Sequence, residues 1–104
     1  MDHHYPKTRD PKVFEYFDKE TLGAFGKWNE LVLKDGKLNR KIKELVAVAC
    51  TYMTRCPYCI KGHAEAALKA GATKEELAEV IQIAMALSAG ACIAHRDIAL
   101  NLEL

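Results

Sequence analysis

The chain has 104 residues, enough for one domain with a hydrophobic core. Its 15 Lys and Arg residues nearly balance 14 Asp and Glu residues, which leaves a net charge of +1. A charge so close to zero excludes the strongly charged surface that attracts nucleic acid or anionic lipid, so we expect neither a nucleic-acid nor a membrane partner.

The first ten residues, MDHHYPKTRD, are polar and do not form a signal peptide. We expect residues 1–10 to be a flexible tail within a single domain that spans residues 1–104. No run approaches the roughly 20 apolar residues of a membrane helix. The sequence therefore predicts a cytoplasmic protein, and in that reducing compartment its cysteines do not build a structural disulfide framework.

The N-terminal third predicts two helices. Asp10 followed by Pro11 is typical of a helix start, with Asp as the cap and Pro at the first helical position. Thr21 is expected to cap a second helix, which ends near Gly36. The aromatic residues of both helices recur at helical spacing and are expected in the core. They are Phe14, Phe17, Phe25 and Trp28.

The middle of the chain predicts two helices joined by a short loop. Asn39 caps the first, which is apolar on every side from residue 45 to residue 50 and is therefore expected to be central. The sequence Cys-Pro-Tyr-Cys starts the second helix, with Pro57 in its first turn, and Gly71 ends it.

The C-terminal third predicts two further helices. Thr73 and Glu76 form a capping box for an apolar helix that is expected to be buried nearly all round. The small residues 88–91 predict a break, and a last helix follows to about Asn101. No segment alternates at period two, so the predicted fold class is all-α with about six helices.

Two such apolar helices need more covering surface than a chain of this length supplies. The alanines of the last third, together with Gly90, allow backbones to approach closely. We therefore expect a homo-oligomer. Close packing within one chain remains the alternative explanation of these small residues.

The residues that carry chemistry gather around the Cys-Pro-Tyr-Cys sequence. Cys56 and Cys59 lie at a predicted helix start, and His63 follows four residues later on the same helical face. A thiol attacks as thiolate, so a reactive site must lower a pKa of about 8.5. The positive end of the helix favours the thiolate, His63 can accept a proton, and Glu44 can orient the histidine. This combination indicates a redox site.

A glutaredoxin is one alternative, because Cys-Pro-Tyr-Cys is the active-site sequence of that family. A thioredoxin-type site, however, follows a β-strand and needs a later cis-proline. Here a helical run precedes the motif, and no proline occurs after Pro57.

A zinc site is a second alternative. The usual structural site joins two separated ligand pairs, whereas this chain has one tight cluster and an ambiguous fourth ligand. We therefore expect no metal and no cofactor. The candidate ligands would be Cys56, Cys59 and His63, with Cys92 or His95 as the fourth.

The chain also resembles a known family in the order and spacing of four residues. Eleven residues separate Glu44 from Cys56, two separate Cys56 from Cys59, and three separate Cys59 from His63. This pattern resembles the signature of the alkylhydroperoxidase-D-like proteins of the carboxymuconolactone decarboxylase superfamily, and the resemblance covers roughly residues 38–95. It implies an all-helical fold, trimers or hexamers, and a dithiol that reduces hydroperoxides or disulfides. The electron donor would be a lipoyl or thioredoxin-like dithiol.

The resemblance also implies a role for each of these residues. Cys59 would be the more buried cysteine that attacks the peroxide, and Cys56 would close the disulfide and meet the electron donor. Glu44 and His63 would form a proton relay. Some members have a histidine between the cysteines, but Tyr58 stands here and cannot act as a base near neutral pH, so disulfide reduction is expected to exceed peroxidase activity.

Other members of the superfamily, the decarboxylases, lack the cysteine pair, which argues against lactone decarboxylation here. Tyr58 and His95 are candidate pocket residues, whereas Cys50 and Cys92 are expected in the core as small hydrophobic residues. A metal-binding or redox-sensing helical module without fast turnover remains the alternative function.

Overall fold

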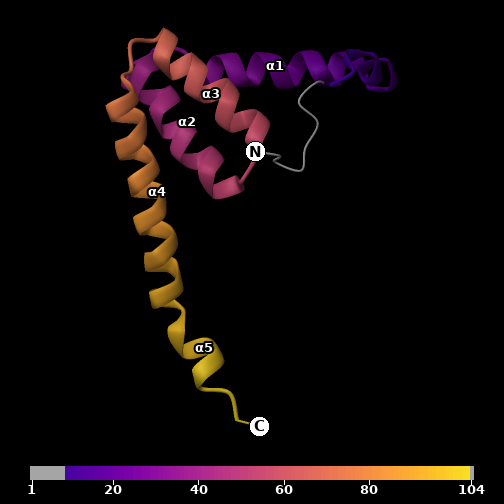
Figure 1. Ribbon diagram of the computed structural model, residues 1–104. Helices are drawn as coiled ribbons and strands as arrows, with labels where there is room; N and C mark the ends of the chain where they lie inside the picture. The colour runs from indigo at the N-terminus through magenta and orange to yellow at the C-terminus, as the bar shows by residue number, and fades with distance from the viewer. Residues whose placement is uncertain (1–8, 104) are drawn as a thin grey trace.

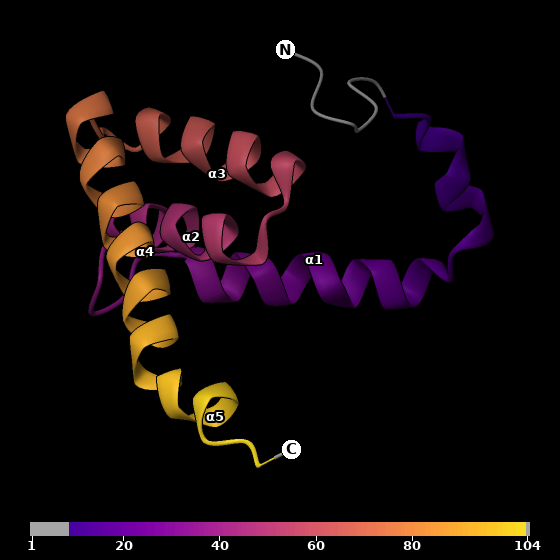
Figure 2. The ribbon, with the colours of Figure 1, turned by 60° about the horizontal axis from the view of Figure 1, so that its bottom comes forward.

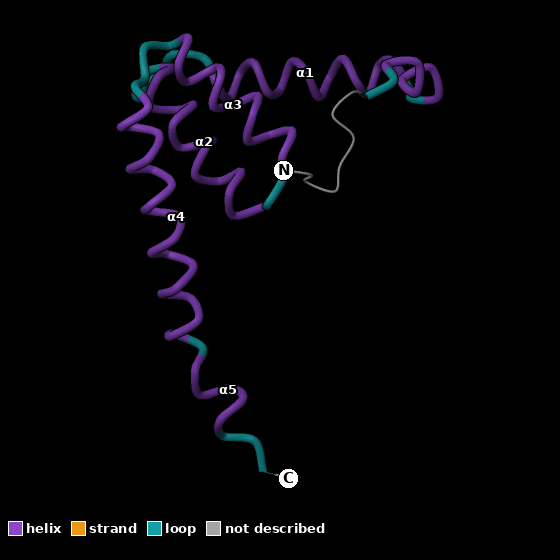
Figure 3. Tube along the Cα trace, in the orientation of Figure 1, coloured by secondary structure: helices purple, strands orange, loops and turns teal. Residues whose placement is uncertain are grey.

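The computed structural model describes residues 9–103, which form five α-helices, one short 3₁₀ helix and no strand (Figures 1 and 3). The elements are η1 Pro11–Tyr16, α1 Lys19–Leu33, α2 Arg40–Thr54, α3 Pro57–Lys69, α4 Lys74–Ala94 and α5 Arg96–Leu100. The all-α prediction is confirmed, with a 3₁₀ helix as the first of the expected elements. Most of the expected tail, residues 1–8, lies outside the described residues.

Helix α2 is central, as its apolar sequence predicts. It contacts α1, α3 and α4, and α3 runs alongside it in both views (Figures 1 and 2). The small core consists of Val48 from α2, Ala67 from α3 and Ala72 from the turn after α3. Because α2 and α3 meet through small and medium side chains, groups on their facing surfaces come within hydrogen-bond distance.

Most of the predicted helix ends are confirmed. Asn39 accepts the N–H of Ile42 at the start of α2, and Thr73 and Glu76 make both hydrogen bonds of the capping box. The cap of α1 was predicted wrongly, because it is Asp18 rather than Thr21. Thr21 instead donates its N–H and its hydroxyl to the Asp18 carboxylate. A carboxylate accepts the free N–H groups at an exposed helix start better than a threonine hydroxyl does, so Asp18 becomes the cap.

The predicted break at residues 88–91 does not occur. Helix α4 continues to Ala94 and ends at His95. Alanine is the strongest helix former, so the surrounding alanines outweigh the cost of about 1 kcal/mol that one glycine imposes on a helix.

Burial is the property that the sequence predicted least well. Trp28 is 64% exposed and Phe25 60%, because α1 projects away from the α2–α3 pair (Figure 2). In α4 the buried residue is Ala84, so the expectation of a helix buried all round is wrong for the single chain. Cys50 and Cys92, expected in the core, are exposed as well.

The C-terminal helices form the most apolar stretch of the described chain, although no run in them reaches the roughly 20 apolar residues of a membrane helix. Within the described part of the chain, one helical stretch of 27 residues is long and apolar enough to cross a membrane by length and composition alone, with a mean hydropathy of 1.8 over an 18-residue window. It covers Lys74–Leu100, that is α4 with α5. Only 6% of its apolar window is buried, so this surface is largely uncovered in one chain.

Candidate redox site

The cysteine pair lies where the chain turns from α2 into α3. Arg55 adopts the left-handed conformation, with φ 59°, and reverses the chain direction after Thr54. Cys56 then caps α3, and Pro57 occupies the first turn, where its missing N–H costs no hydrogen bond. The Cys56 Sγ accepts the backbone N–H of Cys59 at 3.3 Å. The predicted helix-start position of the dithiol is thus confirmed.

The two thiols have opposite electrostatic environments. Hydrogen bonds from the Cys59 side chain and then from the Cys59 N–H lower the pKa of Cys56 below its usual value, against a smaller opposing effect of burial. The pKa of Cys59 is raised, first because its thiol donates to Cys56 and second because of burial. The pair therefore favours a thiolate on Cys56 and a proton on Cys59.

This arrangement corrects one implication of the family resemblance. Cys59 was expected to be the more buried cysteine, but it is exposed, whereas Cys56 is half-buried. The reason is local, because the Cys56 N–H donates to the Thr51 carbonyl oxygen in the last turn of α2, while Cys59 is on the first turn of α3. In this structure the more acidic thiol and the more buried one are both Cys56.

A buried carboxylate links α2 to α3 beside this corner. Glu44 is only 1% exposed, and its Oε1 lies 2.8 Å from Nδ1 of His63. Its Oε2 accepts a hydrogen bond from Nη2 of Arg40 at 3.3 Å. The structure thus brings together Glu44 and His63, the predicted relay pair. Sequence reasoning missed Arg40, although residues four apart on a helix are neighbours, so its position before Glu44 could have predicted this ion pair.

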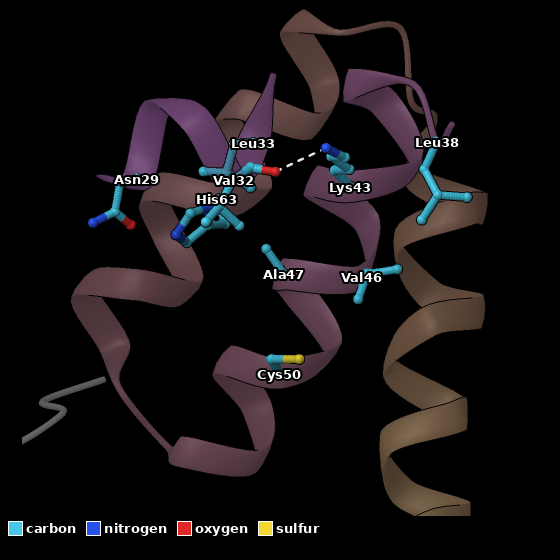
Figure 4. A pocket seen from close by; sticks show the side chains of 9 residues that line it. All are labelled: Asn29, Val32, Leu33, Leu38, Lys43, Val46, Ala47, Cys50 and His63. Atoms are coloured by element: carbon cyan, nitrogen blue, oxygen red, sulfur yellow. Dashed lines mark hydrogen bonds between the residues drawn. The ribbon is translucent and has the colours of Figure 1, made fainter. Parts of the chain in front are cut away.

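His63 also borders a pocket of about 410 Å³ between α1, α2 and α3 (Figure 4). Lys43 closes one side, where its Nζ donates to the carbonyl oxygens of Val32 at 2.9 Å and Lys34 at 2.7 Å. These hydrogen bonds satisfy carbonyl groups at the C-terminal end of α1 and hold that end against α2. The lining residues are mostly apolar: Asn29, Val32, Leu33, Leu38, Lys43, Val46, Ala47, Cys50 and His63.

Tyr58 contacts the redox corner rather than this pocket. It is half-buried on α3, and the Arg9 guanidinium lies 4.1 Å from the centre of its ring. The positive charge of Arg9 makes a small contribution that lowers the pKa of both Cys56 and Cys59. Arg9 is the second residue that sequence reasoning missed, because nothing local links it to a tyrosine so far along the chain.

His95 lies apart from the dithiol. It separates α4 from α5, is exposed, and places Nδ1 2.9 Å from the Ala91 carbonyl oxygen. The junction of these helices is at the far end of α4 from α3 (Figure 1). Among residues 9–103, no three His, Cys, Asp or Glu side chains are grouped so that they could hold a metal ion. The zinc alternative therefore lacks a converging set of ligands.

Comparison with known proteins identifies the family. A model of the carboxymuconolactone decarboxylase family matches residues 19–99. The chain belongs to this family. The match includes α1 to α4 and all four residues of the Glu-Cys-Cys-His pattern, so this protein is an alkylhydroperoxidase-D-like member of the carboxymuconolactone decarboxylase family.

Two bacterial proteins are similar to this chain over about two thirds or more of its length. An uncharacterized protein in the cox locus of Paracoccus denitrificans is 43% identical over 77 residues, which cover 74% of this chain and 69% of that protein. An uncharacterized protein of Cupriavidus necator is 36% identical over 69 residues, which cover 66% of this chain and 61% of that protein.

Solved structures show the same fold. A protein from Methanobacterium thermoautotrophicum has a TM-score of 0.74 and 36% identity, and the match covers 81% of this chain and 97% of that one. A carboxymuconolactone decarboxylase family protein from Legionella pneumophila has a TM-score of 0.67 and 34% identity, covering 73% and 68%. A Thermotoga maritima family member, which has been connected with an antioxidative response, has a TM-score of 0.65 and 28% identity, covering 81% and 87%.

Proposed function

We propose that this family member is a thiol-dependent oxidoreductase that reduces disulfides and, more slowly, hydroperoxides. The observation that carries the proposal is the joint placement of two devices. Cys56 caps α3 by accepting the Cys59 N–H, which favours its thiolate form, and the buried Glu44 carboxylate holds His63 one helical turn after Cys59. The first device supplies a nucleophile, and the second can accept the proton that Cys59 must lose.

In disulfide reduction, the Cys56 thiolate attacks one sulfur of the substrate. The substrate S–S bond breaks, a thiolate leaves, and a mixed disulfide forms on Cys56. His63 then accepts the proton of Cys59, whose sulfur attacks Cys56 and releases the second thiolate of the substrate. Two electrons have passed to the substrate, and a Cys56–Cys59 disulfide remains for an external dithiol to reduce.

In peroxide reduction, the Cys56 thiolate attacks the terminal oxygen of the hydroperoxide. The O–O bond breaks, the alkoxide takes a proton to become the alcohol, and Cys56 becomes a sulfenic acid. Cys59 loses its proton to His63 and attacks this sulfur, and the departing hydroxide takes a proton to become water. The T. maritima relative's link to an antioxidative response supports this branch.

The remaining partners follow from the same chemistry. The donor is a lipoyl or thioredoxin-like dithiol, because a second dithiol closes its own disulfide as it reduces Cys56–Cys59. A reducing compartment such as the cytoplasm suits a dithiol that must be returned to its reduced form. The exposed apolar surface of α1 and α4 supports a homo-oligomer, a trimer or hexamer.

Steady-state turnover tests the proposal. Purified protein is offered several hydroperoxides and small disulfides, with dihydrolipoamide, thioredoxin or glutathione as donor in turn. We expect turnover with at least one dithiol donor, its loss in Cys56→Ser and Cys59→Ser, and its retention in the matched control Cys92→Ser. A single oxidation with no turnover for any donor would contradict the proposal and indicate a redox sensor.

A further inference from the structure

One chain of this protein leaves far more surface uncovered than its mass predicts. Its accessible area is 8895 Å², whereas a compact monomer of 11.6 kDa exposes about 5,800 Å². Its radius of gyration is 17.7 Å, against about 13 Å for a compact chain of this length. The excess of about 3,000 Å² per chain exceeds the roughly 1,000–2,500 Å² that each partner buries in a typical obligate interface, so it is large enough for such an assembly.

Part of this excess belongs to the C-terminal arm, which we define as residues 88–100. Ser88 donates a hydrogen bond to the sulfur of Met53 at 3.2 Å, and Met53 is the residue before the last of α2. The arm therefore runs on past the end of α2 and away from the helical body (Figure 1). Its large side chains are uncovered, with Ile93 65%, Ile98 67% and Leu100 81% exposed.

The same chain offers a receptor for such an arm. An apolar groove of about 310 Å³ lies between α2 and the first half of α4. Its lining contains no charged residue and consists of Leu45, Val46, Ala49, Cys50, Met53, Val80, Ile83, Ala84 and Leu87. The arm carries no charge before Arg96, so it can enter this groove without burying an unpaired ion.

We propose that the C-terminal arm of a second copy of this chain lies in the α2–α4 groove and extends the lining of the pocket beside His63. Val46 and Cys50 line both the groove and that pocket. An arm in the groove would therefore contact two lining residues of the space that His63 borders and extend its lining. This inference rests on the proposed assembly and names its surface.

A second copy accounts for these features better than a lipid bilayer does. The stretch without charged residues, 80–95, rises about 24 Å as a helix, which is less than the roughly 30 Å of a hydrocarbon core. The first half of α4 already packs against α2, so lipid could not surround the helix. Each chain supplies one arm and one groove, so identical chains cover both surfaces in equal number.

Crosslinking between native cysteines tests the docking, because Cys50 lies in the groove and Cys92 in the arm. Cys56→Ser/Cys59→Ser protein, assembled from a mixture of ¹⁵N-labelled and unlabelled chains, is treated with a short bismaleimide and mapped by mass spectrometry. We expect Cys50–Cys92 crosslinks that join labelled to unlabelled chains and disappear in a further Cys50→Ser variant. Oligomers that lack this crosslink, or form it only within one chain, would overturn the proposed docking.

A charge in the arm provides a second test. Ile93→Glu should convert the oligomer into 11.6 kDa monomers by light scattering, with helical circular dichroism retained, because the groove has no partner for a carboxylate. The matched control Val13→Glu, on η1, should leave the mass unchanged. A wild-type protein that is monomeric and floats with phosphatidylcholine vesicles would overturn the proposal in favour of lipid. Neither experiment measures turnover, so the docking can fail while the proposed chemistry stands.

Discussion

The two sulfurs of the redox corner have opposite pKa shifts, and the hydrogen bond from the Cys59 thiol is the first cause of the lowered pKa of Cys56. Cys59→Ala removes that donor and should raise the pKa of Cys56, although the backbone N–H at residue 59 still donates. Cys59→Ser restores a donor and should return the pKa towards the wild-type value. Thiolate absorbance of Cys56, titrated with Cys50 and Cys92 replaced by serine, measures both. Identical titrations for the two variants would show that the Cys59 side chain has no such effect.

Glu44 is the residue whose removal should most weaken the relay. Glu44→Gln preserves the shape of the side chain but removes the carboxylate that orients His63, at a cost on the order of 10²-fold in turnover. The pKa of Cys59, measured in a Cys56→Ser background, should change as well. The control is Glu65→Gln, an exposed carboxylate on the same helix as His63, which should leave turnover unchanged. If His63→Gln abolishes turnover while Glu44→Gln leaves it intact, the relay ends at His63.

Arg9 should tune the dithiol from outside the helices. Arg9→Gln removes a positive charge that lowers the pKa of both cysteines, so the Cys56 thiolate should form at a slightly higher pH. The guanidinium is exposed, so the change should be small and should shrink as salt is added. Arg9→Lys retains the charge and should titrate like the wild type. A shift that is equal in both variants would point to packing on Tyr58 rather than to charge.

At the scale of elements, the end of α3 depends on one backbone conformation. Gly71 has φ +103°, which an L side chain adopts only with strain, so Gly71→Ala should cost about 1 kcal/mol or more of unfolding free energy. Gly62 lies within α3 with open space around an added Cβ, so Gly62→Ala should stabilise by about 0.5–1 kcal/mol. Thermal unfolding measures both. A stabilised Gly71→Ala would mean that the turn does not require glycine.

The element ends that the sequence predicted share a short-range cause. Asn39, Thr73 and Gly71 each act on backbone groups within a few residues, so the residue type and its neighbours decide the structure. The two errors arose where local signals compete. Asp18 and Thr21 can both cap α1, and the alanines around Gly90 outweigh it.

The contact between Glu44 and His63 was predicted from the chemistry of the two side chains and from the family pattern, although the two residues lie on different helices. The contact between Arg9 and Tyr58 had no signal of either kind. Long-range pairs of this sort depend on how helices pack, which single-sequence periodicity does not determine. The site could therefore be predicted as a set of residues, but its geometry could not.

At the scale of the molecule, the aromatic and apolar stripes were expected in the core of one chain, yet Trp28 and Ile93 are more than half exposed. Helical periodicity identifies which face must be covered, but it does not say whether the cover comes from the same chain. The low burial of α1 and α4 is what the proposed assembly predicts, because other copies would then complete the core.

The central claim is that the Cys56–Cys59 dithiol is the redox centre, and disulfide mapping after one equivalent of hydroperoxide tests it most directly. Cys50 and Cys92 are exposed, as Cys59 is, so exposure alone would not select the pair. Cys56 has both a lowered pKa and a neighbouring thiol within hydrogen-bond distance. We predict that peptide mass spectrometry will find a Cys56–Cys59 disulfide with Cys50 and Cys92 still reduced. A dominant disulfide that includes Cys50 or Cys92 would contradict the account.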